Sequence, residues 1–177
     1  MYIVFEGVDG TGKSTQIPLV QKRLQKYFKE KKLDFEVVTI NEPEIKTKYD
    51  DDHEYALAYA LQRKQIWNQT RKQHDYYCVF NPNIIISDRS FYSSLAYQKK
   101  AQHYVHDINK IFPRPVKVFL FEKGRPLNGG LEEIRQEYHE VLGNPVMVNT
   151  KHKSIEETTE YITNQIIQIW KEWNQYE

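Results

Sequence analysis

The chain is poor in cysteine, with Cys78 as the only one among 177 residues. An internal disulfide is therefore excluded, and with it the small secreted folds that depend on such bridges, so a reducing compartment is expected. Cys78 lies in the run Tyr-Tyr-Cys-Val-Phe at residues 76–80. We interpret it as a packed thiol rather than a nucleophile.

Long apolar runs are lacking as well. No stretch approaches the ~18 consecutive apolar residues that a membrane span requires. Met1 leads directly into a strand pattern, without the basic and apolar regions of a signal peptide. We therefore expect a cytoplasmic protein with no membrane partner.

The chain also lacks an excess of charge of either sign. The chain has 25 basic and 24 acidic residues, which leaves a net charge of +1. Proteins that bind nucleic acid or membrane surfaces through their overall field carry a clear basic excess. We expect no nucleic acid partner, and any recognition of anions must come from local sites.

One motif dominates what is present. Residues Phe5 to Thr15 read F-E-G-V-D-G-T-G-K-S-T and contain the P-loop pattern G-x-x-x-x-G-K-[ST] without substitution. An apolar strand pattern precedes the motif and a helical pattern follows it. The glycines let the backbone curl around an anion, next to the positive end of the helix. Lys13 is expected to reach the β- and γ-phosphates of a nucleotide, and the Ser14 hydroxyl to hold Mg²⁺.

Strand patterns alternate with helical patterns along the chain. This alternation predicts an α/β fold with a five-stranded parallel sheet and helices on both faces. With the P-loop it indicates the three-layer α/β/α P-loop NTPase fold, in a single domain of residues 1–177. We expect strands at residues 1–5, 35–40, 84–87, 116–121 and 146–148, and helices at residues 13–30, 53–76, 92–100, 131–142 and from 154 onward.

Some details of the helices can be predicted. Pro18 removes one N–H from the first helix and predicts a kink there. Ser154 and Glu157 have the spacing of a capping box for the last helix. The predicted inner faces are Leu57, Leu61, Ile66 and Trp67 in the long helix, and Ile155, Ile162, Ile166, Ile169 and Trp173 in the last one.

The loops that follow the five strands should meet in one crevice, because ligands of parallel α/β sheets bind beyond the carboxyl ends of the strands. Asp88, at the end of a buried strand, is suited to bind magnesium, and the Arg89 guanidinium is suited to bind a phosphate group through two hydrogen bonds. The alternative for both residues is a surface ion pair or a helix cap. Glu42 is either a magnesium or acceptor-side group or a solvated acid. The loops are residues 6–12, 41–44, 88–90, 122–130 and 149–151.

Three further stretches narrow the class of protein. The chain reads L-A-Y-A-L-Q-R at residues 57–63, D-R-S-F-Y-S-S-L-A-Y-Q at residues 88–98 and V-M-V-N-T-K-H-K-S-I-E-E at residues 146–157. With the P-loop they resemble the thymidylate kinase family of nucleoside monophosphate kinases, in the same order and over nearly the whole chain. The resemblance implies transfer of the γ-phosphate of ATP to thymidine monophosphate with Mg²⁺ as cofactor. It also implies small-molecule nucleotides as partners and suggests a homodimer.

The resemblance implies a role for each matching residue. Lys13, Arg89 and Arg125 would neutralise charge, and Ser14 and Asp88 would hold the metal, so that the catalytic group is Lys13, Asp88, Arg89 and Arg125. The implied ATP site is Gly7, Val8, Asp9, Gly10, Thr11, Gly12, Lys13, Ser14 and Thr15, with Asn149 and Lys151 on the adenine side. The implied acceptor site is Asp9 at the sugar, Glu42, Tyr59 stacked on thymine, Arg63 at its exocyclic oxygen, Arg89 at the phosphate, and Ser94, Tyr97 and Gln98, with Tyr97 disfavouring a 2′-hydroxyl.

The sequence also departs from the family pattern. Where the family has Arg-Glu-Pro-Gly after the second strand, this chain has Asn-Glu-Pro-Glu at residues 41–44. The predicted lid at residues 122–130 is short and carries Arg125, with Lys123 beside it. The P-loop interior has no arginine, so the lid must supply the cation for efficient transfer.

Three alternatives therefore stay open. The missing arginine favours a kinase for another nucleoside or monophosphate. The reduced lid favours a nucleotide-binding regulator with weak turnover. A nucleic-acid-dependent ATPase is disfavoured by the near-zero net charge and the small size.

Overall fold

The computed structural model describes residues 1–41, 47–74, 84–123, 127 and 129–174. Glu42, Cys78 and Arg125 lie outside the described residues. None of the helices within the described ranges is long and apolar enough to cross a membrane. The elements are β1 (Tyr2–Glu6), α1 (Lys13–Glu30), β2 (Val37–Asn41), α2 (Asp52–His74), β3 (Ile84–Asp88), α3 (Phe91–Tyr97), a 3₁₀ turn (Lys99–Ala101), α4 (Gln102–Ile108), β4 (Lys117–Glu122), α5 (Gly130–Leu142), β5 (Val146–Asn149) and α6 (Ile155–Asn174).

The strands form one parallel sheet in the order β2-β3-β1-β4-β5. β1 is central, and Phe5 lies beside Asp88 of β3 on one side and Phe119 of β4 on the other. All five residues of β1 are buried, as a strand covered on both faces must be. The predicted α/β fold, with a five-stranded parallel sheet, is confirmed.

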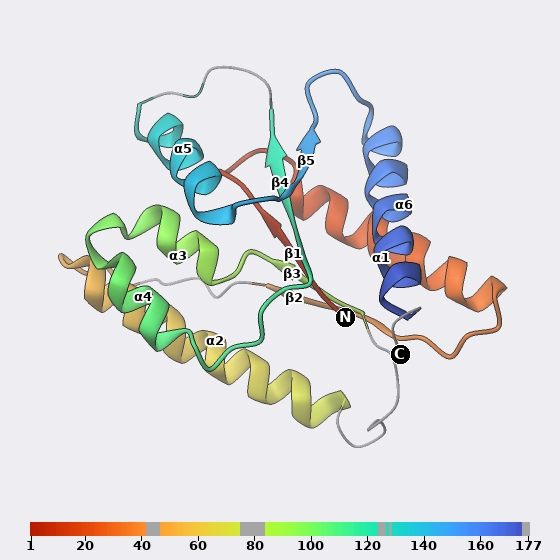
Figure 1. The fold of residues 1–177 in the computed structure, drawn as a ribbon, viewed down its shortest axis with the longest axis horizontal. Coiled ribbons are helices and arrows are strands. Elements are labelled where there is room, and N and C mark those ends of the chain that lie inside the picture. The colour runs from red at the N-terminus through yellow and green to blue at the C-terminus, as the bar shows by residue number, and fades with distance from the viewer. Residues whose placement is uncertain (42–46, 75–83, 124–126, 128, 175–177) are drawn as a thin grey trace.

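Helices cover both faces of the sheet, with α1 and α6 together on one side (Figure 1). Alternate residues of β1 point to opposite faces. Ile3 and Phe5 pack against α1 and α6, in the same cluster as Leu24 and Ile162. Tyr2 faces the other way and packs edge-on against Trp67 of α2, with ring centroids 5.0 Å apart.

The predicted inner face of α2 is wrong in part. Leu57 and Leu61 are 42% and 56% exposed, whereas Trp67 is buried. The buried stripe lies about one residue further around the helix, which corresponds to about 100° of rotation. The stripe combines small, aromatic and polar side chains, and Ala56, Ala60 and Trp67 in it pack in apolar clusters with β1, α3 and α4. Its residues are Ala56, Ala60, Arg63, Trp67 and Thr70.

The predicted face of α6 is also wrong at its ends. Ile155 and Trp173 are exposed, while Ile162 and Ile166 are fully buried. Three threonines share the buried face, and each hydroxyl donates to the carbonyl four residues earlier at 2.7–2.9 Å, which satisfies it without water. They are Thr158, Thr159 and Thr163. The capping box is present: Ser154 N donates to Glu157 and Glu157 N donates to Ser154 Oγ.

The segment after β3 is more broken than the sequence suggests. Ser90 caps α3, because its hydroxyl accepts from Tyr92 N at 3.3 Å. The predicted helix at residues 92–100 ends at Tyr97, where Gln98 leaves helical geometry, and α4 follows without having been predicted. α1 runs through Pro18 as one helix, and the kink stays a prediction.

Candidate active site

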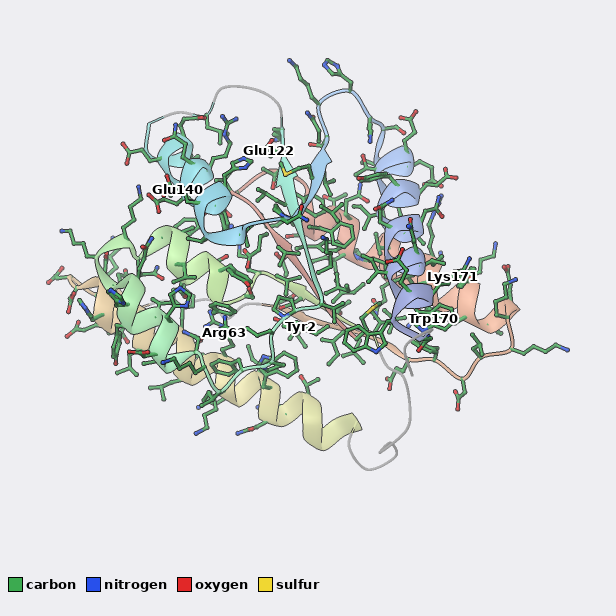
Figure 2. The ribbon with its side chains drawn as sticks, in the orientation of Figure 1. Tyr2, Arg63, Glu122, Glu140, Trp170 and Lys171 are labelled. Atoms are coloured by element: carbon green, nitrogen blue, oxygen red, sulfur yellow. The ribbon has the colours of Figure 1, made fainter. Side chains whose placement is uncertain are left out.

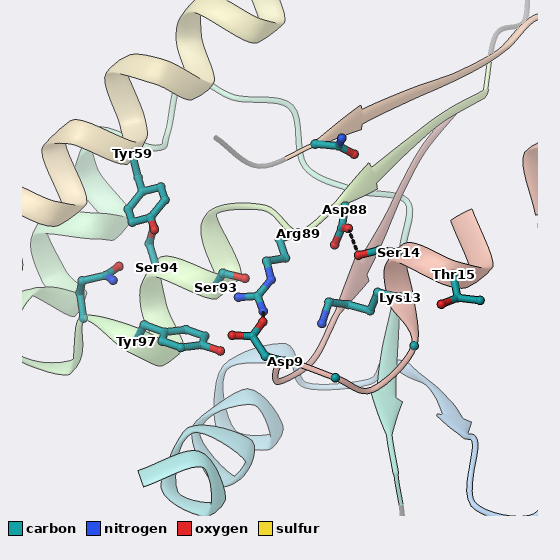
Figure 3. Close-up of a pocket in the computed structure, with 14 residues that line it drawn as sticks. Asp9, Lys13, Ser14, Thr15, Tyr59, Asp88, Arg89, Ser93, Ser94 and Tyr97 are labelled. Atoms are coloured by element: carbon teal, nitrogen blue, oxygen red, sulfur yellow. Dashed lines mark hydrogen bonds and ion pairs between the residues drawn. The ribbon is translucent and has the colours of Figure 1, made fainter. Parts of the chain in front are cut away.

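A pocket with a cavity volume of about 760 Å³ opens at the carboxyl ends of β1, β2 and β3 (Figure 3). The P-loop forms one side of it, and α2 and α3 form the other. This is the position predicted for the crevice. The lining residues are Asp9, Gly10, Gly12, Lys13, Ser14, Thr15, Asn41, Tyr59, Asp88, Arg89, Ser93, Ser94, Tyr97 and Gln98.

Two glycines of the P-loop have conformations that side chains rarely adopt. Gly7 has φ 133° and lies against β4, where a Cβ atom would come within 2.5 Å of Phe121 O. Gly12 has φ 101° and precedes α1 as its N-cap. The backbone can therefore curve round an anion directly at the positive end of α1.

Lys13 is held inside the loop. Its Nζ donates to Gly7 O at 2.7 Å and to Val8 O at 2.9 Å. Burial, and then the nearby Arg89 guanidinium, lower the pKa of Lys13 to about 8, although Asp88 and other carboxylates oppose this shift. Figure 3 shows the Lys13 amine on the pocket side of the loop, near Asp9 and Arg89.

Ser14 and Asp88 come together from separate elements. Ser14 Oγ at the start of α1 donates to Asp88 Oδ2 at the end of β3, at 2.9 Å. A hydroxyl and a carboxylate are hard oxygen donors of the kind that Mg²⁺ prefers. Across the part of the chain that the structure describes, no group of three or more His, Cys, Asp or Glu side chains could hold a metal. The two oxygens are the described side-chain groups at this position that fit such an ion.

Arg89 projects into the pocket from a backbone turn with φ 72°. Its guanidinium forms an ion pair with Asp9 of the P-loop and lies over the ring of Tyr97, 5.4 Å from the centroid (Figure 3). A left-handed conformation is uncommon for a residue other than glycine, and it is found at functional sites where the surroundings enforce it.

The far wall of the pocket comes from α2 and α3. Tyr59, Ser94, Tyr97 and Gln98 all line it, as predicted from the sequence. Oε1 of Gln98 is buried and receives no hydrogen bond. A buried acceptor of this kind needs a donor from water or a ligand.

Arg63, labelled in Figure 2, is buried and does not line the large pocket. Its Nη1 donates to Asn109 Oδ1 at 2.5 Å and its Nη2 donates to Ser94 Oγ at 3.4 Å. It borders a smaller neighbouring cavity together with Asn41. Asn109 holds the guanidinium, and no sequence motif points to it because it lies 46 residues away.

The adenine-side residues remain apart from the pocket lining. Asn149 ends β5 at the edge of the sheet, and its Oδ1 accepts from Lys151 N at 2.9 Å. Both side chains are exposed. Their role in binding ATP stays a prediction, as do the roles of Glu42 and Arg125 outside the described residues.

The end of β4 brings one more cation to the P-loop. A Cβ atom on Gly10 would lie 3.7 Å from Nζ of the half-buried Lys123. Beside it, Glu122 lies at the carboxyl end of β4 (Figure 2). Nε2 of His139 in α5 donates to Oε1 of Glu122 at 2.7 Å.

A buried polar cluster under the pocket was missed from the sequence. It consists of Glu6, Ser90, Ser93 and Tyr138, which belong to β1, the turn after β3, α3 and α5. The available signal was Glu6 itself, an acid at the end of a wholly apolar central strand, because a buried carboxylate requires partners.

Comparisons with known proteins agree with this geometry. The family model "Thymidylate kinase" matches residues 5–128. A "Probable thymidylate kinase" of Methanobrevibacter smithii is 36% identical over 137 residues, which is 69% of this chain and 64% of that protein, slightly under two thirds. Another of Methanocaldococcus jannaschii is 28% identical over 94% of both chains.

A solved structure shows the same fold. The crystal structure of thymidylate kinase from Ehrlichia chaffeensis matches with a TM-score of 0.71, covering 96% of this chain and 98% of that one. Sequence identity is 20%, so the match establishes the shared fold.

Proposed function

Because the chain belongs to the thymidylate kinase family, we propose that it transfers the γ-phosphate of ATP to thymidine monophosphate and releases the diphosphate. One observation carries the proposal: a P-loop and a wall of the residue types that bind an acceptor nucleotide face each other across a single pocket. Phosphoryl transfer asks mainly for this placement of donor and acceptor, and for positive charge around the transferred group.

The donor phosphates bind the P-loop side. Its backbone N–H groups and the N-terminus of α1 hold the phosphate oxygens. Lys13 turns from Gly7 O and Val8 O toward the β- and γ-phosphates. Ser14 and Asp88 hold Mg²⁺, which when bound neutralises the charge on the phosphate oxygens.

The acceptor binds the opposite wall. Arg89 leaves Asp9 to grip the acceptor phosphate, and Asp9 turns to the sugar. Tyr59 stacks on the base, while Ser94 and the unpaired Gln98 Oε1 meet its polar edge. The acceptor phosphate is already ionised, so the site needs no strong general base.

Lys123 supplies part of the charge that the P-loop lacks. Lys123 is a described residue at the start of the predicted lid, and its ammonium group lies beside Gly10. Arg125, predicted for the same task, follows two residues later in the chain. The homodimer suggested by the family also stays a prediction.

A second candidate acceptor deserves a test. Asn41 lines the pocket where the family has an arginine, so the grip on the acceptor phosphate is weaker by one cation. A nucleoside, which has no phosphate to grip, or a different nucleoside monophosphate is the substrate that this difference favours.

The test is ADP release from ATP and Mg²⁺ with each nucleoside and monophosphate offered singly. A strong preference for thymidine monophosphate is expected. Activity with another acceptor alone would keep the kinase and discard the thymine site. ATP binding without any acceptor-dependent ADP release would make the protein a nucleotide-binding regulator.

A further inference from the structure

The buried polar cluster under the pocket connects β1, the turn after β3, α3 and α5. Ser90 Oγ donates to Glu6 Oε1 and Ser93 Oγ donates to Glu6 Oε2, both at 2.7 Å. The hydroxyl of Tyr138 lies 2.7 Å from Ser93 Oγ. Glu6 and Tyr138 have no exposed surface and do not line the pocket, so neither touches a ligand.

The direction of each hydrogen bond in the cluster follows from the number of protons. A hydroxyl has one proton, and Ser93 gives its own to Glu6, so Tyr138 must donate to Ser93 Oγ. Burial, and then the Glu6 carboxylate, raise the pKa of Tyr138 well above its ordinary value, which keeps this proton in place. Both oxygens of Glu6 accept, as suits a carboxylate.

The cluster surrounds the turn that carries Arg89. Arg89 N donates to Phe5 O at 2.9 Å, and Arg89 O accepts from Ser87 Oγ at 2.5 Å. The next residue, Ser90, is tied to the side chain of Glu6. Consecutive residues of β1 therefore hold consecutive residues of the turn, which enforces the left-handed backbone of Arg89.

Tyr138 supports the same guanidinium from another side. Its ring meets the ring of Tyr97 edge-on, with centroids 6.3 Å apart, and the Arg89 guanidinium lies over that same Tyr97 ring. Tyr138 belongs to α5, which follows the predicted lid along the chain. α5 is therefore linked to Arg89 by the Tyr138–Tyr97 ring contact and to Glu6 by the hydroxyl of Ser93.

We propose that Glu6 is a positioning residue for the acceptor phosphate: through Ser90, Ser93 and Tyr138 it fixes the Arg89 turn relative to the P-loop and α5. This role rests on the proposed function, since it acts on the group that grips the acceptor. Glu6 does not line the pocket, and its proposed effect on the acceptor phosphate runs through Arg89.

The experiment measures the contribution of the acceptor phosphate to binding. The ratio of the Kd of thymidine to the Kd of thymidine monophosphate is determined by calorimetry for the wild-type chain, Glu6→Gln and Tyr138→Phe. We expect Glu6→Gln to lower this ratio about tenfold and Tyr138→Phe about threefold, because each removes or weakens a bond in a charged cluster. The Kd of ATP should change less than about twofold.

Two controls separate positioning from general stability. Tyr161→Phe, on α6 at the opposite face of the sheet, removes a hydroxyl without touching the cluster and should leave the ratio unchanged. In an Arg89→Ala background, Glu6→Gln should have no further effect on the ratio, because the side chain that it positions at the acceptor phosphate has gone.

The outcomes are distinct. A wild-type chain that binds thymidine and thymidine monophosphate equally would overturn the proposed acceptor, and the role of Glu6 with it. A wild-type preference that survives in Glu6→Gln would overturn the role of Glu6 alone. Should Glu6→Gln fail to fold, Tyr138→Phe keeps the ring packing and decides the question: an unchanged ratio overturns the proposal. An equal effect of Glu6→Gln with and without Arg89 would also overturn it.

Discussion

The two halves of the pocket are built in different ways. The P-loop half comes from one continuous segment, residues 5–15, and it offers mainly backbone groups whose direction is set by Gly7 and Gly12. The opposite half gathers side chains from α2, α3 and the turn after β3, and these depend on buried partners such as Asn109. A local motif suffices for the first half, whereas the second requires the packing of the whole domain.

Lys13→Ala is expected to abolish the contribution of the P-loop half to phosphoryl transfer. It removes the positive charge that stabilises the transferred phosphoryl group, so turnover should fall by ~10³-fold or more. The Kd of thymidine monophosphate should stay within about twofold, since Lys13 lies on the other side of the pocket. Steady-state kinetics and acceptor calorimetry measure both quantities. Retained turnover would remove the P-loop from the mechanism.

Arg63→Ala tests whether the acceptor half depends on its buried partners. The change removes a buried guanidinium and leaves Asn109 and Ser94 without a donor. We expect the Kd of thymidine monophosphate to rise about a hundredfold and the Kd of ATP to stay constant. Arg23→Ala on α1, at a surface ion pair, is the matched control. Unchanged acceptor affinity would mean that the base binds elsewhere.

Lys123→Ala tests the cation beside Gly10, and Arg125→Ala tests the arginine predicted for the lid. Each should lower kcat by about tenfold and leave the KM of ATP nearly unchanged, because a charge that acts on the transition state contributes little to ground-state binding. Lys123→Arg should restore most of the loss, as it keeps the charge beside Gly10. Equal losses in kcat and ATP affinity would instead assign these residues to ATP binding.

Lys151→Ala tests the loop after β5, which is predicted to lie on the adenine side of ATP, and it should have the smallest effect. Lys151 is exposed beyond β5, and removal of one exposed charge is expected to raise the Kd of ATP about threefold. The acceptor Kd should not change. Lys171→Ala at the far end of α6 provides a control for loss of surface charge. A loss of tenfold or more would show that this loop closes on the nucleotide.

The same contrast explains what could be predicted from the sequence. The five strands and their parallel arrangement follow from short apolar runs and their alternation with helices, and the P-loop follows from an unbroken motif. Leu57 and Leu61 were misplaced because the buried face of α2 mixes alanines, Trp67, Arg63 and Thr70, which gives no clear apolar period. Asn109 and Tyr138 could not be foreseen as parts of the site, since only the folded chain brings them to Arg63 and Ser93.

The central position of β1 has a consequence for synthesis of the protein. Both neighbours of β1 come much later in the chain, β3 at Ile84–Asp88 and β4 at Lys117–Glu122. On the ribosome, the P-loop residues emerge early but cannot take their final shape until Phe121 is present to lie against Gly7. A nascent chain halted before that point would carry the complete motif without the neighbouring strands that shape it, and it is expected to bind no nucleotide.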